Sequence, residues 1–158
     1  MATPNRTLIV NDIIETLRGI SEANDVGASG QKYKRSVACV ERLAKTWAQT
    51  KPQVRPWIGV VAGREQWAYQ PGACVRVTLR VTLIAHDVTD KADPDRRAES
   101  LGDLLDDIAA SLNVDTRRGG AATMTTVKEV ETDEAAPEGG ISMVIGVDVV
   151  YQRTTGAT

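Results

Sequence analysis

The stretch VRVTLRVTLIAH, residues 75–86, decides the fold class of this chain. Apolar residues occupy every second position from Val75 to Ala85, and arginine or threonine fills the positions between them through Thr82. Because successive side chains of a strand point to opposite faces, this spacing predicts one strand with a core face and a polar face. At about 3.3 Å per residue the strand is roughly 40 Å long, about twice the usual length. We therefore expect a long central strand that extends past the core of its own domain.

Two amphipathic helices are predicted around this strand. The first begins at Thr3-Pro4, where an N-cap residue precedes a proline at the first helical position, and runs to Ile20. The second begins with the same signal at Asp93-Pro94 and ends near Asn113. Both carry apolar residues at three- and four-residue steps, which gives each helix one apolar face to pack.

The region before the long strand is harder to interpret. Residues 36–50 fit both a strand and a helix, and we expect a strand first and a short helix after it. Residues 57–61 form a short apolar run that is typical of a buried strand. Gly63 then allows a turn or a bulge, and residues 66–70 continue as the far arm of a hairpin.

The chain closes with two more predicted strands, residues 123–131 and 141–151, joined by an acidic loop at 132–140. The resulting order is α, β, β, β, β, α, β, β, with hairpin-length connections. We therefore predict a single α+β domain over residues 1–158: a mostly antiparallel β-sheet with a long central strand, flanked by two main α-helices. Flexible segments are expected near 24–34 and 132–140, and the C-terminal tail is expected to be short and disordered.

Composition excludes several classes of function. The net charge is −2 with 25% charged residues, so neither nucleic acid nor an anionic membrane is an evident electrostatic partner. The N-terminus lacks the apolar run of a signal peptide, and no stretch approaches the roughly 18 apolar residues of a membrane helix. Cys39 and Cys74 have no metal or redox spacing, and both are expected to be reduced. We expect a protein that is made and used in the cytosol or in something assembled there.

No residue pattern matches a catalytic motif. His86 and Asp87 resemble a general-base pair, but no nucleophile accompanies them in a recognisable motif, and a solvated strand end explains them. Asp90, Asp93 and Asp95 invite a metal site, yet they lack the glycine and the glutamate of a calcium loop, and a helix start explains them. We predict no catalytic residues, no metal and no cofactor, and hence no enzyme.

Two further sets of residues invite a binding function. Trp47, Trp57 and Trp67 are spaced like a stacking platform, but without a basic stretch they are better read as core or interface anchors. Arg117-Arg118 precedes a double glycine and suggests a phosphate contact. Two arginines are too few for the many phosphate contacts that drive nucleic-acid affinity, so we predict no specific nucleic-acid binding.

The order of segments resembles that of phage tail terminator proteins, over most of residues 5–153. The features that carry the resemblance are the N-terminal amphipathic helix, PWIGVV at 56–61, the long strand ending in His86-Asp87, the helix at 97–112, the turn at 115–121 with its double glycine, TVKEV at 126–130, and VDVVY at 147–151. The resemblance rests on arrangement and on short phrases, and it brings no catalytic residues.

The resemblance implies a structural role in the virion. Subunits of that family close into a ring, typically a hexamer, that caps the head-proximal end of the tail tube, stops its polymerisation and offers a surface for head–tail joining. The implied partners are further copies of the chain in a homohexameric ring, the tail tube protein, the head–tail connector or neck proteins, and the sheath of a contractile tail. The implied location is the tail or neck of the virion, assembled in the host cytoplasm, with DNA passing through the ring.

Seven charged residues are our candidate interface residues, chosen by position alone. They are Arg76 and Arg80 on the polar face of the long strand, Arg117 and Arg118 at the turn, and Glu131, Asp133 and Glu134 at the acidic loop. Each also has a plain interpretation as solvated surface. Three other functions stay open at this point: another neck, head-completion or tail-tube-like protein; a small-molecule-binding α+β domain; and an enzyme that uses His86 and Asp87.

Overall fold

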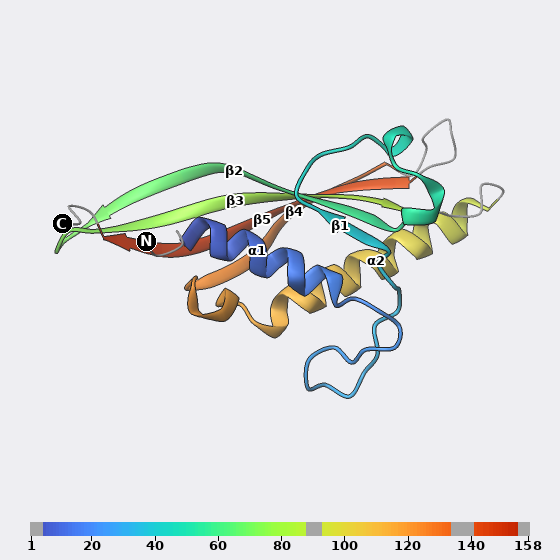
Figure 1. Ribbon diagram of the computed structural model, residues 1–158, viewed down its shortest axis with the longest axis horizontal. Coiled ribbons are helices and arrows are strands. Elements are labelled where there is room, and N and C mark those ends of the chain that lie inside the picture. The colour runs from blue at the N-terminus through green and yellow to red at the C-terminus, as the bar shows by residue number, and fades with distance from the viewer. Residues whose placement is uncertain (1–4, 88–92, 134–140, 155–158) are drawn as a thin grey trace.

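The computed structural model describes residues 5–87, 93–133 and 141–154. A five-stranded sheet in the order β1-β2-β3-β5-β4 has both helices on one face (Figure 1). The elements are α1 (Asn5–Arg18), β1 (Cys39–Glu41), β2 (Trp57–Gln70), β3 (Cys74–Asp87), α2 (Pro94–Val114), β4 (Met124–Asp133) and β5 (Ile141–Thr154), with 3₁₀ turns at Trp47–Gln49, Pro52–Val54 and Arg118–Gly120. Only the β1–β2 pair is parallel among the described strands. The α+β fold and the mostly antiparallel sheet are confirmed.

The long central strand is present as predicted. β3 spans 14 residues, and its alternating apolar side chains from Val75 to Ala85 are fully buried. Its neighbours β2 and β5 also span 14 residues each. The three strands together form a ribbon that projects beyond both helices, toward the left of Figure 1. We call the part of this ribbon at residues 66–70, 74–78 and 150–154 the arm.

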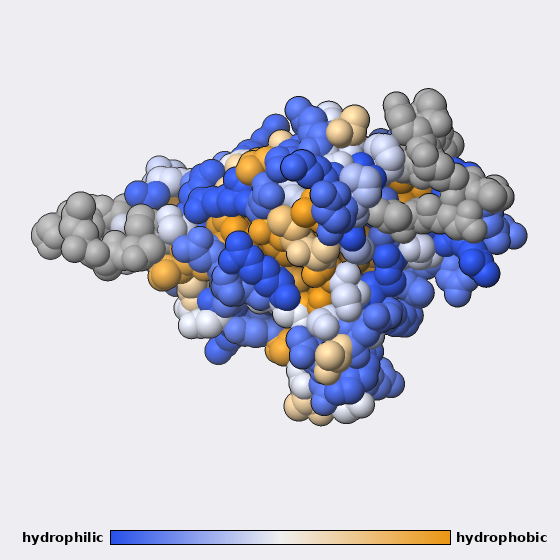
Figure 2. Space-filling model, turned by 45° about the vertical axis from the view of Figure 1, so that its right-hand side comes forward, coloured by the Kyte–Doolittle hydropathy of each residue, from blue (hydrophilic) through white to orange (hydrophobic). Residues whose placement is uncertain are grey.

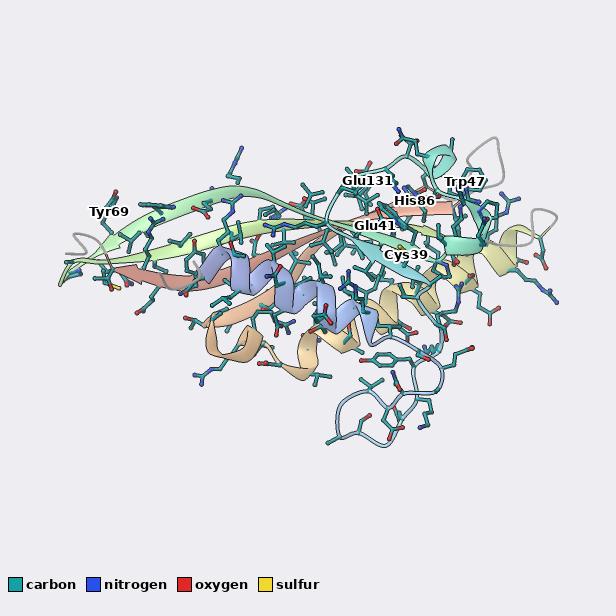
Figure 3. All side chains as sticks on the ribbon, in the orientation of Figure 1. Cys39, Glu41, Trp47, Tyr69, His86 and Glu131 are labelled. Atoms are coloured by element: carbon teal, nitrogen blue, oxygen red, sulfur yellow. The ribbon has the colours of Figure 1, made fainter. Side chains whose placement is uncertain are left out.

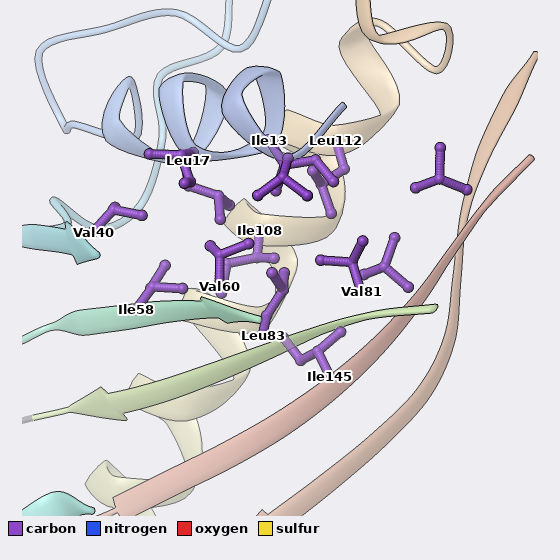
Figure 4. Close-up of a cluster of buried hydrophobic side chains, with 14 of the residues drawn as sticks. Ile13, Leu17, Val40, Ile58, Val60, Val81, Leu83, Ile108, Leu112 and Ile145 are labelled. Atoms are coloured by element: carbon purple, nitrogen blue, oxygen red, sulfur yellow. The ribbon is translucent and has the colours of Figure 1, made fainter. Parts of the chain in front are cut away.

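The core lies between the helices and one face of the sheet (Figure 4). α1 contributes Ile13 and Leu17, and α2 contributes Ile108 and Leu112, because the apolar residues of both helices fall on one side. They pack on side chains from four strands, all of them buried: Val40, Ile58, Val60, Val81, Leu83 and Ile145. Most of the surface in Figure 2 is hydrophilic, with apolar residues gathered in a band across the middle of the view.

The prediction of a hairpin within residues 57–70 is wrong. β2 is one continuous strand, and the register shift between Ala62 and Glu65 makes Gly63 part of a bulge. The hairpin turn lies instead between Gln70 and Cys74, where Gly72 has a φ of 86°. Three strands therefore precede α2 in place of four. Glycine fits a bulge as well as a turn, so its presence alone could not decide between them.

Two bulges lie level with each other across the sheet. In β2 the extra residue follows Ala62, and in β4 it follows Val127. Ala62 is paired with Val81, Val81 with Val147, and Val147 with Val127, so both bulges begin at the same row of residues. A bulge bends its strand and increases the local twist. We therefore expect the sheet to twist more strongly at this row, which lies between the start of β2 and the arm.

The remaining boundary predictions are mostly confirmed. Asp93 caps α2, because its side chain accepts hydrogen bonds from the backbone N–H groups of Asp95 at 3.0 Å and Arg96 at 3.4 Å. Residues 36–50 contain a strand and then a short 3₁₀ helix, in the expected order. Both cysteines are free and begin strands. The helix start at Thr3-Pro4 and the residue Asp90 lie outside the described residues.

The connection between α1 and β1 extends away from the sheet (Figure 1). It folds back on itself at a bridge between Asp25 and Lys32, whose side chains form an ion pair at 2.8 Å. The backbone N–H of Val26 also donates to the carbonyl of Gln31 at 2.7 Å. In the parts of the chain that the structure describes, no helix is both long and apolar enough to cross a membrane.

Candidate subunit interface

The face of the sheet opposite the helices carries the predicted polar row of β3. We call it the outer face; its β3 members are Arg76, Thr78, Arg80, Thr82, Ile84 and His86. The side chain of Arg76 is exposed and lies on the arm, between Ala68 of β2 and Gln152 of β5. Among the described residues Arg76 has no ion-pair partner. It therefore presents an unbalanced positive charge on the arm.

Arg80 is held in place by acidic neighbours on the same face. Its Nε donates to Asp148 at 2.6 Å, and its Nη1 lies 3.6 Å from a carboxylate oxygen of Glu129. The hydrogen bond to Asp148 raises the pKa of Arg80. Gly146 leaves the space for this guanidinium, since a Cβ there would stand 2.7 Å from Nη1. The charge of Arg80 is thus balanced within its own chain.

An open cavity of about 360 Å³ lies beside this cluster on the outer face. Arg64 and Gln66 from β2 and Thr78 from β3 complete its lining, with Arg80, Glu129 and Asp148. Arg64 belongs to the bulge of β2, and no described residue forms an ion pair with it. The cavity therefore has one cation that its own chain does not balance.

The acidic candidates lie on β4, which is an edge strand. Glu131 (Figure 3) and Asp133 are exposed, and with Glu129 they occupy outer-face positions opposite β5. β4 continues through Asp133, two residues further than the predicted strand. Glu134 lies outside the described residues. The outer face of β4 thus carries the three carboxylates of Glu129, Glu131 and Asp133.

The two arginines of the turn have different surroundings. Arg117 is exposed, whereas only 2% of the surface of Arg118 is exposed. Arg118 Nη1 lies 3.1 Å from a carboxylate oxygen of Asp12, and Nη2 donates to the carbonyl of Leu112 at 2.6 Å. The prediction that Arg118 is an interface residue is therefore wrong. The 3₁₀ turn directs this side chain inward, where it joins α1 to the end of α2.

His86 is also buried, contrary to the prediction of a solvated strand end. Its Nε2 lies 2.6 Å from the carbonyl oxygen of Lys45, and its Nδ1 lies 2.7 Å from Ser142 Oγ. Because a carbonyl only accepts, Nε2 carries the proton and Nδ1 accepts from the serine hydroxyl. The ring stacks on Trp57 with centroids 5.5 Å apart. Residues 42–56 cross the outer face here (Figure 3), and burial lowers the pKa of His86.

The contact between Ser142 and His86 is explained by strand packing. Ser142 lies inside β5, paired with His86 of β3 on one side and with Asp133 of β4 on the other. Its backbone is therefore engaged in the sheet, and no N–H of this strand is left there to stabilise an oxyanion. In the described ranges no three histidine, cysteine or acidic side chains gather as metal ligands would.

Asp87 points away from His86, because adjacent residues of a strand face opposite sides. Its carboxylate accepts hydrogen bonds from both terminal nitrogens of Arg35, each at 2.6 Å, and from Ser100 Oγ at 2.7 Å. The side chain of Asp87 is fully buried and that of Arg35 is 20% exposed. The alternative of a general-base pair with His86 is therefore not formed, and Asp87 instead joins β3 to α2 and to the chain before β1.

The feature that sequence reasoning missed is the open edge of β2. β1 is paired with β2 only at Trp57, Ile58 and Gly59, so residues 60–70 of β2 have no described strand on that side. Figure 1 shows this part of β2 as the outermost strand. Two exposed aromatic residues lie on it: Trp67, 42% exposed, and Tyr69, 75% exposed.

The start of the arm is fixed to α1 through Glu65. This carboxylate accepts hydrogen bonds from Arg6 at 2.8 Å, from Trp67 Nε1 at 3.0 Å and from the Tyr151 hydroxyl at 3.2 Å. Burial favours a higher pKa for Glu65, but the three hydrogen bonds together lower it. The guanidinium of Arg153 lies 4.9 Å from the ring centroid of Trp67, on the side of the sheet that carries the helices.

The three tryptophans occupy different environments and form no common platform. Trp57 is buried and Trp67 lies on the open edge. Trp47 is half-buried: its Nε1 donates to the carbonyl of Asp87 at 3.2 Å, and the guanidinium of Arg55 lies 3.7 Å from its ring centroid. Core anchoring therefore describes Trp57, and Trp67 remains available to a partner.

Comparison of the sequence with models of known protein families finds no match. A search of curated proteins also finds no relative.

Proposed function

We propose that this protein is a phage tail terminator: a subunit that closes into a ring on the head-proximal end of the tail tube, stops tube polymerisation and provides the surface for head–tail joining. The observation that carries the proposal is the unequal pair of sheet edges. One edge, on β2, is open beside unbalanced arginines, and the strand at the other edge, β4, carries carboxylates on its outer face. Two different, complementary surfaces on one subunit suit a head-to-tail contact, which closes into a ring when the rotation between copies allows it.

The arm supports the same proposal. Three 14-residue strands form a ribbon that extends past the helices, and its edge on β2 carries the exposed side chains of Trp67 and Tyr69. It adds surface that a neighbouring subunit or the tube can contact. The order of segments along the sequence resembles that of phage tail terminators, and this resemblance is our reason for assigning the proposed ring to the tail.

A ring elsewhere in the neck is the second candidate. A connector or head-completion protein would use the same two edges to close, and it differs in what it binds. The binding of the ring to tail tube ends and to head connectors therefore has to be tested in separate experiments. The cavity on the outer face is open and lined by polar and charged residues, which does not favour a small-molecule-binding domain, since such sites are concave and mostly lined by apolar residues.

The test uses the full chain and the tail tube protein of the same phage. Native mass spectrometry and negative-stain electron microscopy of the purified chain are expected to show a closed ring of defined copy number. Added to polymerising tube protein, the ring is expected to occupy one end of each tube and to shorten the tubes as its concentration rises. A strictly monomeric chain that also leaves tube growth unlimited would refute the proposal. Rings that ignore tube ends but bind the head connector would favour the second candidate.

A further inference from the structure

We infer that the open edge of β2 pairs with strand β4 of a second copy of this chain, with Glu131 of one copy facing Arg64 of the next. The inference rests on the proposed ring and names the two surfaces that close it. Four observations carry it: the unprotected edge, the direction of the strands, the position of β1 and the charges.

The edge of β2 lacks the usual protection against pairing. Soluble proteins blunt exposed edges with charges, prolines or short strands. Residues 66–70, QWAYQ, contain no charge and no proline, and they carry the exposed Trp67 and Tyr69. β4 is different, because Lys128, Glu129, Glu131 and Asp133 make it a charged edge. Like charges keep two β4 strands apart, so β4 suits a different partner strand.

The direction of the strands allows an ordinary ladder. β2 is antiparallel to β3, β3 to β5, and β5 to β4, so β4 runs antiparallel to β2 of the same chain. A neighbour related by a small rotation keeps the direction of its strands. Its β4, placed beside β2, is then antiparallel to it, and the sheet continues from copy to copy. The 10 residues of β4 also match the length of the open edge at residues 60–70.

Strand β1 fixes the stagger between the copies. Asp133 is paired with Ser142, Ser142 with His86 and His86 with Trp57, so β4 ends level with the start of β2. β1 already occupies β2 at Trp57–Gly59. A neighbouring β4 must therefore slide toward the arm by at least three residues. Closure of a sheet requires such a stagger between its strands.

The faces of the sheet then select the contact. A shift by an odd number of residues would pair outer-face positions of one copy with helix-side positions of the next, and the helices of the two copies would then lie on opposite faces of the sheet. The smallest shift that clears β1 and keeps the helices on one face is therefore about four residues. Glu131 lies level with Gly59 in its own chain, through Val144 and Ile84. Moved by four positions, Glu131 arrives at the bulge of β2, on the outer face, beside Arg64. A carboxylate thereby reaches the cavity whose arginine is unbalanced.

The test is a charge exchange measured by native mass spectrometry and sedimentation velocity on the full chain. Glu131→Lys and Arg64→Glu each place like charges across the contact, and each is expected to weaken association at least about tenfold at low salt. Glu99→Lys and Lys51→Glu change the net charge equally at exposed positions outside strands β2 and β4, and they are expected to assemble as the wild type does.

An equimolar mixture of the two interface variants gives the decisive result. At one contact the lysine of the Glu131→Lys copy would meet the glutamate of the Arg64→Glu copy, and at the next contact the unchanged Glu131 and Arg64 would meet. The mixture is therefore expected to form alternating rings with an even number of copies. Recovery in the mixture also excludes misfolding as the cause of the loss.

Three results would overturn the pairing. The first is the formation of wild-type-like rings by either single variant. This result would refute the pairing of β2 with β4 but not the terminator function, which is tested separately on tube ends. The other two are loss of rings without recovery in the mixture and a wild-type chain that is monomeric.

Discussion

Replacing Asp87 with asparagine should destabilise the protein more than any exposed charge substitution. The amide keeps the size of the side chain but removes the charge, and it presents an NH₂ group toward the Arg35 guanidinium or toward Ser100. Asp87 is fully buried and accepts three hydrogen bonds of 2.6, 2.6 and 2.7 Å from these two residues. The variant therefore loses a bidentate ion pair and leaves a guanidinium without its counter-charge.

The size of the effect follows from the burial of the two partners. Removing one partner of a buried ion pair costs about 3–5 kcal/mol. Because the Arg35 side chain is 20% exposed, water can reach part of the guanidinium, and we expect the lower end, about 3 kcal/mol. The double variant Arg35→Gln/Asp87→Asn restores an amide pair and should recover about 1 kcal/mol, the usual net contribution of a hydrogen bond.

Urea denaturation followed by circular dichroism measures this loss. The midpoint should fall while the slope m stays constant, since the surface exposed on unfolding is unchanged. Asp106→Asn is the matched control, because its ion pair with Lys34 is more than half exposed on both sides and should contribute little to stability. If Asp87→Asn costs no more than this control, the buried pair does not stabilise the fold in the way we argue.

Four further substitutions test other parts of the fold. Gly59→Ala should destabilise the protein by about 2 kcal/mol or more, because the new Cβ would stand 2.2 Å from the Leu43 carbonyl oxygen. Gly102→Ala lies in open space on α2 and should stabilise the protein by up to about 1 kcal/mol. Thermal melts in which both variants shift the melting temperature in the same direction would refute this. Burial lowers the pKa of His86 below its usual 6.5, so the unfolded chain binds the proton more readily, and stability present above pH 6.5 should be lost as the pH falls, by at most about 1.4 kcal/mol per pH unit. His86→Gln should flatten that dependence in urea titrations from pH 7 to 5, and an unchanged slope would assign it to other groups. Asp93→Ala removes the N-cap of α2 and should lower the free energy of unfolding by about 1 kcal/mol in the same assay. An unchanged free energy of unfolding would show that the cap does not stabilise the helix.

Local patterns predicted the elements whose character is local. The alternation of Val75 to Ala85 defines a strand with one buried face whatever surrounds it. The Asp93-Pro94 signal likewise sets the start of α2, since both the cap and the proline act on the first turn alone. Arg76 was expected on the polar face of the long strand and lies there, whereas Glu131 and Asp133 were expected at the acidic loop and lie on β4.

The errors concern residues whose surroundings come from distant parts of the chain. His86 ends a strand, as predicted, but residues 42–56 cross over it and bury it. Arg118 belongs to a turn, as predicted, but α1 supplies Asp12 from more than a hundred positions away. Gly63 fits a turn and a bulge equally, and only the register with β3 decides between them.

The open edge of β2 depends on strand order. β2 becomes an edge strand over residues 60–70 because β1 is three residues long. No periodicity in residues 57–70 reports which strands lie beside them. The uncharged QWAYQ segment was the one local sign of a surface without protection, and it was visible only once the strand had been placed at an edge.

A small change of angle at the paired bulges, which follow Ala62 and Val127, produces a large displacement at the tip of the arm. From Glu65 to Gln70 the ribbon extends roughly 20 Å beyond the row of bulges, so a rotation of the arm by about 10° at this row moves its tip by roughly 3 Å. Core packing decides how firmly the subunit holds together, whereas one row of backbone decides where the arm points. In a closed circle of copies that angle recurs at every contact and accumulates around the circumference. In the ring that we propose, the curvature and the width of the central channel would then depend on the angle at this row more than on the core.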